Sequence, residues 1–112
     1  MKKTLFILLS LFLIVGCEKD QRIETSWYEN GQKMSEITYK YGKQDGLWTE
    51  WYENGQKEGE GTYKYVNNYR DPEREGKWTE WFENGKKKYE ETYKDGNIIS
   101  VKKWNRGGGE EE

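Results

Sequence analysis

The sequence of 112 residues contains no histidine and only one cysteine. Without histidine it lacks the most common general base and the most common metal ligand of proteins. The single cysteine, Cys17, cannot form a disulfide within the chain. No aspartate-rich loop of the calcium-binding kind occurs either. We therefore expect no metal, no cofactor and no catalytic residues, and we predict that the protein is not an enzyme.

Aliphatic residues are scarce after Cys17, where valine, leucine and isoleucine together number only seven. The whole chain contains six Trp, nine Tyr and three Phe. An aromatic ring buries on the order of 150–250 Å², and aromatic residues suit the half-buried faces of β-strands. The sequence therefore predicts an all-β fold whose core consists of aromatic rings.

The charges of the chain nearly cancel, with 19 basic and 21 acidic side chains and a net charge of −2. Lysine and glutamate alternate along the chain, which is typical of a solvated surface. Nucleic-acid-binding domains usually carry a clear basic excess. We therefore expect no nucleic-acid partner.

The first residues have the pattern of a targeting segment. Two lysines precede an apolar run of 11 residues, 5–15, which is shorter than the roughly 20 residues of a membrane-spanning helix. The run continues into Ile14-Val15-Gly16-Cys17, which resembles the lipobox of bacterial lipoproteins. We interpret residues 1–16 as a lipoprotein signal peptide and Cys17 as the lipidation site.

This resemblance implies cleavage before Cys17 and acyl chains on that residue. Two or more acyl chains hold a protein stably on a membrane, so we expect an exported protein, lipid-anchored to the cell membrane or the outer membrane. Residues 17–26 then contain the lipidated cysteine and a polar tether. The alternative is an ordinary secretory signal in which the cysteine is incidental.

One heptapeptide occurs three times, at residues 27–33, 51–57 and 81–87. Each copy begins with tryptophan and contains Glu-Asn-Gly, and a Tyr-Lys pair follows twelve residues after that tryptophan. Self-similarity of this kind indicates stacked structural repeats. The predicted repeat region, residues 27–105, has the units 27–50, 51–80 with an insertion at 66–75, and 81–104 with a closing strand.

Each copy places Asn-Gly between two strand-like runs, which is the strongest short-range signal for a β-hairpin. The predicted turn residues are Asn30, Gly31, Asn54, Gly55, Asn84 and Gly85. A two-residue turn, which we favour, pairs Tyr52 with Lys57, Trp48 with Gly61, and Gly46 with Tyr63. A three-residue loop that ends in glycine is the alternative, and it shifts the pairing by one residue.

In the favoured register Trp48, Tyr52 and Tyr63 share one face of the sheet, and Gly61 leaves room for the Trp48 ring. The opposite face carries Trp51 and, by repetition, Trp27 and Trp81. These three are candidate partner-binding residues for a glycan, a peptide or a protein, since exposed aromatic residues are enriched at interfaces. Alternatively, a thin sheet uses both faces for its own packing.

The sequence predicts a short, twisted single-layer sheet of about seven antiparallel strands. The last of them covers residues 98–104, and its aliphatic side chains would cover the open end of the stack. Residues 106–112 have the composition of a flexible acidic tail.

The recurrent Trp-Tyr-Glu-Asn-Gly-Gln-Lys, followed by Tyr-Lys, resembles the MORN-repeat variant family. The resemblance implies tandem antiparallel β-hairpins, often in lipoproteins, and it carries over no catalytic residue. We therefore expect a membrane-anchored, non-catalytic repeat lipoprotein that binds an envelope protein or a glycan. Similar proteins are often described as antitoxins, so the alternative is an antitoxin- or immunity-like protein that neutralises a partner toxin.

Overall fold

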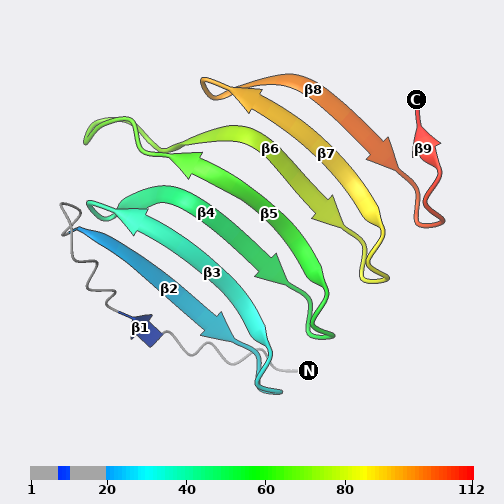
Figure 1. The fold of residues 1–112 in the computed structure, drawn as a ribbon, viewed down its shortest axis with the longest axis horizontal. Helices are drawn as coiled ribbons and strands as arrows, with labels where there is room; N and C mark the ends of the chain where they lie inside the picture. Colours follow the sequence, from blue (N-terminus) through cyan, green and yellow to red (C-terminus); the bar gives the residue numbers. More distant parts are fainter. Residues whose placement is uncertain (1–7, 11–19) are drawn as a thin grey trace.

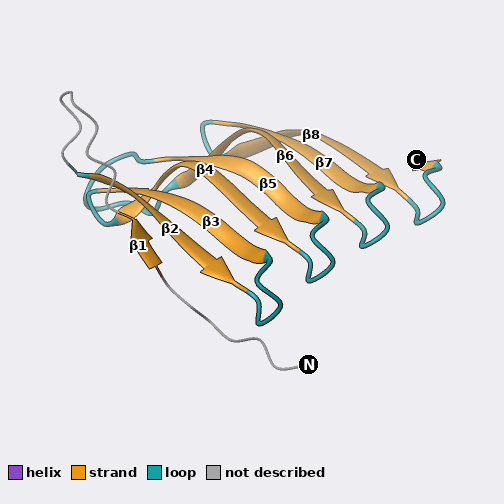
Figure 2. Ribbon diagram, turned by 60° about the horizontal axis from the view of Figure 1, so that its bottom comes forward, coloured by secondary structure: helices purple, strands orange, loops and turns teal. Residues whose placement is uncertain are grey.

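The computed structural model describes residues 8–10 and 20–112, which form one antiparallel sheet of nine strands (Figure 1). Each strand pairs with the next one along the chain. The strands are β1 (Leu8–Ser10), β2 (Gln21–Trp27), β3 (Lys33–Lys40), β4 (Lys43–Trp51), β5 (Lys57–Lys64), β6 (Glu73–Trp81), β7 (Lys87–Lys94), β8 (Asn97–Trp104) and β9 (Glu110–Glu111). Figure 2 shows a single, arched layer without a helix in the described part, which confirms the predicted all-β fold of tandem hairpins.

Strands β2 to β8 match the predicted number of seven, but β2 occupies residues 21–27, so most of the segment 17–26 that we interpret as a polar tether is part of the sheet. The sequence does not predict the two short end strands. β1 pairs with β2, with Leu8 opposite Thr25, and it lies in the segment that we interpret as the signal peptide. Residues 1–7 and 11–19, with Cys17 among them, lie outside the described residues. β9 lies in the predicted flexible tail and pairs with the end of β8.

The predicted two-residue turn is wrong, and the three-residue loop that ends in glycine is present. In the second repeat the Tyr52 amide donates to the Gln56 carbonyl oxygen at 2.9 Å, and the Gly55 amide donates to that of Tyr52 at 3.0 Å. Gly55 has φ +87°, a conformation that glycine adopts without steric cost. The loop is therefore Glu53–Gly55, and Trp51, instead of Tyr52, pairs with Lys57.

A β-bulge next to each turn restores the predicted register farther along the strands. Lys57 pairs with Trp51, but Gly59 pairs with Glu50, so Glu58 is an extra residue on β5. A bulge places two residues of one strand opposite one of its partner. Beyond the bulge the pairs Trp48–Gly61 and Gly46–Tyr63 form as predicted.

The first face, which we call the core face, carries Trp48, Tyr63 and Trp78. The Trp78 side chain is only 5% exposed, and its ring centroid lies 5.2 Å from that of Trp48 and 4.8 Å from that of Tyr63. Gly61 leaves room for Trp78 and not for Trp48, because a Cβ atom on Gly61 would overlap the Trp78 ring. The Trp48 ring instead lies over Gly59, where an added Cβ would be 2.9 Å from it.

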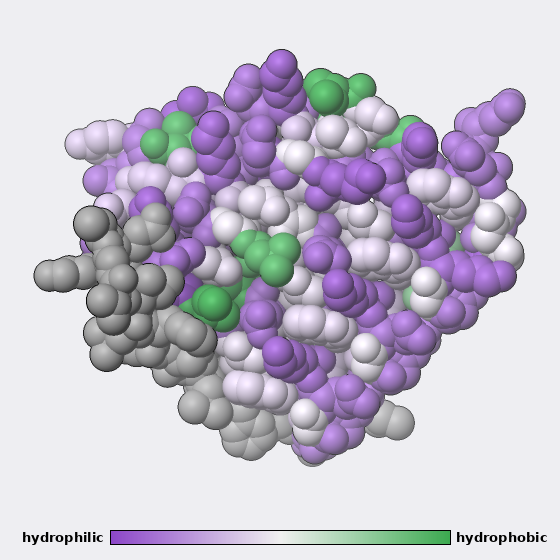
Figure 3. Space-filling model, in the orientation of Figure 1, coloured by the Kyte–Doolittle hydropathy of each residue, from purple (hydrophilic) through white to green (hydrophobic). Residues whose placement is uncertain are grey.

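The opposite face, which we call the stripe face, carries Trp51 and Trp81 and also contributes buried side chains. Threonines of β2, β3, β4 and β6 are at most 8% exposed; they are Thr25, Thr38, Thr49 and Thr79. In the view of Figure 3 the molecule is mostly hydrophilic, with hydrophobic residues in isolated patches. The sheet therefore packs side chains on both of its faces.

Strand β8 closes the stack by pairing with β7, but its aliphatic side chains do not cover the end of the sheet. Ile98, Ile99 and Val101 are 51%, 62% and 46% exposed. The expectation of an aliphatic cover is therefore wrong. An edge strand in a single layer has no second layer against which to bury them.

Candidate functional site

The three predicted partner-binding tryptophans, Trp27, Trp51 and Trp81, each occupy the last position of a strand, and each is half-buried. Trp104 ends β8 in the same way and is the fourth member of the row. We call these four residues the tryptophan stripe. Neighbouring members lie two strands apart, which corresponds to about 10 Å.

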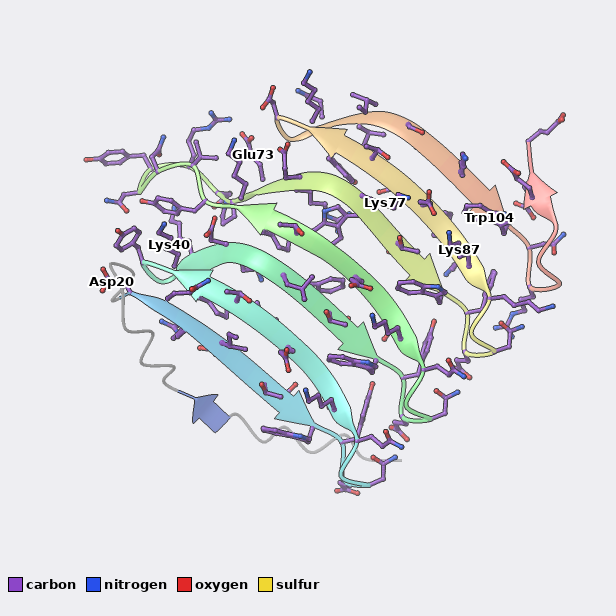
Figure 4. The ribbon with its side chains drawn as sticks, viewed as in Figure 1. Asp20, Lys40, Glu73, Lys77, Lys87 and Trp104 are labelled. Carbon is purple, nitrogen blue, oxygen red and sulfur yellow. The ribbon has the colours of Figure 1, made fainter. Side chains whose placement is uncertain are left out.

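Lysines lie between the rings of the tryptophan stripe. The Lys33 ammonium is 5.7 Å from the centre of the Trp51 ring, and the Lys87 ammonium is 5.5 Å from that of Trp104 (Figure 4 labels Lys87 and Trp104). A cation at this distance over a ring is attracted by its π-electrons, while the aliphatic stem of the lysine covers apolar surface. The rings are therefore partly shielded and do not form an open platform.

These two lysines, and Lys57 at the same position of the second repeat, each form an ion pair with the glutamate three residues later. The nitrogen–oxygen distances are 2.8 Å for Lys33–Glu36, 2.9 Å for Lys57–Glu60 and 2.8 Å for Lys87–Glu90. The stripe face thus presents a regular alternation of ring, ammonium and carboxylate. Such a surface offers apolar and polar contacts at a fixed interval, which suits an extended partner.

Glu90 has the strongest electrostatic environment of the three glutamates. Its carboxylate contacts Lys87 at 2.8 Å and Lys77 of β6 at 3.3 Å, and its side chain is 13% exposed. The hydrogen bond from Lys87 is the main cause that lowers the pKa of Glu90 below its usual value, and Lys77 adds to it. This pair of lysines closes one side of a shallow hollow of about 340 Å³ that also contains Trp81.

The predicted turn asparagines lie at one end of the sheet, in a line that we call the turn row. Each amide donates a hydrogen bond to a carbonyl oxygen of the next turn: Asn30 to Glu53 at 2.8 Å, Asn54 to Glu83 at 2.9 Å, and Asn84 to Arg106 at 3.0 Å. Each side-chain oxygen also accepts a hydrogen bond from the amide two residues later. The asparagines therefore shape their own turns and connect successive repeats.

Two tyrosines reinforce this connection beneath the turns. The Tyr28 hydroxyl donates to the Trp51 carbonyl oxygen at 2.6 Å, and the Tyr52 hydroxyl donates to that of Trp81 at 2.7 Å. Burial raises the pKa of both hydroxyls, and the nearby Glu58 raises it further. The third repeat has Phe82 at this position and lacks the hydroxyl.

A hollow of about 440 Å³ lies between the first and third turns. Tyr28 and Tyr52 line it together with the carboxylates of Glu53, Glu58 and Glu83. None of these three carboxylates forms an ion pair with a described lysine or arginine. This part of the turn row is therefore negatively charged.

The predicted tail contains a fourth turn that was missed. The backbone N–H of Asn105 donates to the Gly109 carbonyl oxygen at 2.8 Å, and the backbone N–H of Gly108 donates to the Asn105 backbone carbonyl oxygen at 3.0 Å, as in the earlier turns. Lys86 also donates to the Gly107 carbonyl oxygen at 2.9 Å. The signal was the tryptophan at the end of a strand, since Trp104 precedes this turn as Trp81 precedes the third.

The described residues contain no cluster of three or more acidic or sulfur ligands that could hold a metal ion. They also contain no helix with the length and apolar character that crossing a membrane requires. Neither finding concerns Cys17, which is not among the described residues.

The hairpins coincide with three matches to the family model "MORN repeat variant", at residues 23–41, 44–65 and 74–95. Together these matches cover more than half of the chain. The chain belongs to the MORN repeat variant family. Each match of the family model ends one residue beyond the Tyr-Lys pair of its repeat, so the matched units are hairpins of the observed sheet.

No curated protein and no solved structure matches the chain. MORN repeats suggest a repeat-based interaction module, and proteins of this kind are in general non-catalytic.

Proposed function

We propose that this MORN-repeat protein is a lipid-anchored interaction module of the bacterial cell envelope, which binds an extended protein or polysaccharide through its stripe face. The observation that carries this proposal is the tryptophan stripe, a row of half-buried rings at one constant interval. Aromatic residues contribute strongly to binding energy at interfaces. A row of them suits a partner that follows the sheet from repeat to repeat.

The anchor is the second part of the proposal. Acyl chains on Cys17 would hold the module at the membrane, and cleavage before that residue would remove β1 from the edge of β2. Radiolabelled palmitate should enter the wild-type protein and not the Cys17→Ala variant. Equal labelling of both proteins would contradict the anchor and would leave the proposed binding face untouched.

Crosslinking in isolated membranes, followed by purification of the lipidated protein, tests the binding face. We expect Trp51→Ala to lose the crosslinked partner and to keep the melting curve of a folded sheet. Tyr69→Ala is the matched control, because Tyr69 is 96% exposed in the loop between β5 and β6, at the end of the sheet opposite the turn row. If Trp51→Ala unfolds, Trp104→Ala at the end of the stripe replaces it. Unchanged crosslinking in a folded stripe variant would contradict the proposal.

The antitoxin- or immunity-like role is the second candidate, and the charge of the turn row favours it. The carboxylates of Glu53, Glu58 and Glu83 would attract a basic protein, since complementary charges speed and orient association. A toxin reading frame next to the gene, and loss of toxin binding in Glu53→Lys, are the expected observations. Loss of binding in Trp51→Ala but not in Glu53→Lys would instead favour the envelope partner.

A further inference from the structure

Three of the four large aliphatic residues that are exposed in the described chain lie on one strand, and the fourth is Leu47 of β4. Ile98, Ile99 and Val101 of β8 are 51%, 62% and 46% exposed, and in Figure 3 hydrophobic areas lie at the upper edge of the molecule as well as near its middle. A large exposed apolar cluster on a soluble domain usually marks an interaction site. This cluster lies near the end of the sheet, next to the third repeat.

The backbone of β8 is also open along most of its outer edge. On that side β9 pairs only with Lys103 and Trp104. The six residues Asn97–Lys102 have no strand partner there among the described residues. Such an edge offers a row of free N–H and C=O groups to another strand.

A bulge in β8 gives this open segment an unusual symmetry. Ile98 pairs with Tyr93 and Val101 pairs with Glu91 of β7, with one extra residue between them. Tyr93 and Glu91 share a face because they lie two residues apart. Ile98 and Val101 therefore also share a face, although they lie three residues apart.

The same holds for the ends of the segment, where Asn97 pairs with Lys94 and Lys102 pairs with Glu90. When the segment pairs antiparallel with a copy of itself, Ile98 lies opposite Val101, and Asn97 lies opposite Lys102. The two members of each pair point to the same side of the joined sheet. The joined strands therefore contain two Ile98–Val101 pairs and two Asn97–Lys102 pairs, and Lys102 of one copy does not face Lys102 of the other.

We infer that β8 pairs with β8 of a second copy of this chain, across a two-fold axis at the middle of Asn97–Lys102. The pairing uses the whole open segment and ends where β9 begins. Isologous interfaces require a self-complementary surface, and a strand from an unrelated protein would not need this match. The contact is small compared with a standard interface, so the dimer should be reversible.

Cysteine crosslinking tests this pairing in the full chain carrying Cys17→Ala, which leaves the introduced thiols as the only ones. Two single variants are made, Ile98→Cys and Val101→Cys. Directly opposite residues of antiparallel strands lie within the Cα–Cα range of a disulfide. We therefore expect a covalent dimer when the two variants are mixed and oxidised, and none when either variant is oxidised alone.

Tyr69→Cys, in an exposed loop, measures crosslinking by random collision. The mixture should exceed it by about tenfold or more, because a preformed pair holds its thiols at a high effective concentration. Circular dichroism checks that both variants remain folded. Dimer formation by Ile98→Cys alone, or a mixture no better than Tyr69→Cys, would overturn the inference.

Discussion

The two ends of the sheet differ in how much they allow the repeats to vary. At the turn row the hairpins of the three repeats have the same five-residue connection from tyrosine or phenylalanine to glutamine or lysine, and each of these three turns donates a hydrogen bond to the next turn. At the opposite end, which we call the connector end, the links are Tyr41-Gly42, the long loop at 65–72 and Asp95-Gly96. The turn row therefore holds the repeats in line, and the connector end tolerates changes of length.

The side chains at the connector end make mostly local contacts. Asn67 accepts a hydrogen bond from the Tyr69 amide within the loop, and the Tyr65 hydroxyl donates to Asn68. A few contacts cross to another connection, such as Lys43 with the Arg70 carbonyl oxygen at 2.7 Å. None of these contacts repeats from one unit to the next, so this end contributes little to the alignment of the stack.

The largest difference is expected from one substitution made at each end. Asn54→Ala removes the hydrogen bond to Glu83 and the one from the Gln56 amide. At about 0.5–1.5 kcal/mol for each of the two net hydrogen bonds, the free energy of unfolding should fall by about 1–3 kcal/mol. Asn67→Ala, the matched control, removes one local contact and should cost less than about 0.5 kcal/mol. Urea denaturation followed by tryptophan fluorescence measures both, and equal losses would contradict the comparison.

The second prediction concerns the tyrosines beneath the turns. Tyr52→Phe keeps the ring and leaves the Trp81 carbonyl oxygen without its 2.7 Å hydrogen bond. An unsatisfied, part-buried acceptor costs about 1 kcal/mol or more, so the unfolding midpoint in urea should decrease. Tyr69→Phe, whose hydroxyl is fully accessible, should leave the midpoint unchanged. The opposite substitution, Phe82→Tyr, would show whether the third repeat can gain the missing hydrogen bond.

Much of this arrangement follows from the sequence. Asn-Gly predicts the hairpins, and the tryptophan–glycine pairing of Trp48 with Gly61 is predicted correctly. The turn type is not predicted correctly, because Asn-Gly suits both a two-residue turn and a three-residue loop. The hydrogen bonds between turns, which involve residues more than 20 positions apart, favour the loop, and no local pattern reveals them.

The errors at the candidate site have similar causes. Gly61 accommodates the ring of Trp78 because β5 also has a neighbour on its other side, where the register of the Glu60–Thr79 pair continues to Trp78 on β6; the hairpin pattern considers only the partner on β4. The glycine-rich tail has a disordered composition, but Asn84 and Lys86 of the neighbouring turn hold it in place. Both features depend on tertiary contacts, whereas the tryptophan stripe follows directly from the repeat.

The third prediction shortens the connector end. Deletion of residues 67–70 removes half of the loop between β5 and β6 and leaves both strands intact. Halving the length of a loop changes its closure entropy by only about 0.6 kcal/mol, so the urea midpoint should change little. Four residues inserted between Glu53 and Asn54 would instead separate the Asn54 hydrogen bonds from the turn and should destabilise the sheet strongly. A larger effect of the deletion would contradict the proposed tolerance.

The smallest expected effect separates ion pairs from the hydrogen bonds of the turn row. The pKa of Glu90 is lowered in the folded protein, mainly by its hydrogen bond with Lys87. Its ionised form therefore stabilises the fold above the unfolded pKa of about 4.3, and this contribution is lost as the pH falls through the lower, folded pKa. Glu90→Gln should reduce the dependence of the unfolding free energy on pH below about 5.

Because surface ion pairs contribute about 0–1 kcal/mol and are screened by salt, added salt should reduce the difference in unfolding free energy between the wild type and Glu90→Gln. The cost of Asn54→Ala should not depend on salt, so a common salt dependence would show that both variants disturb the same interaction.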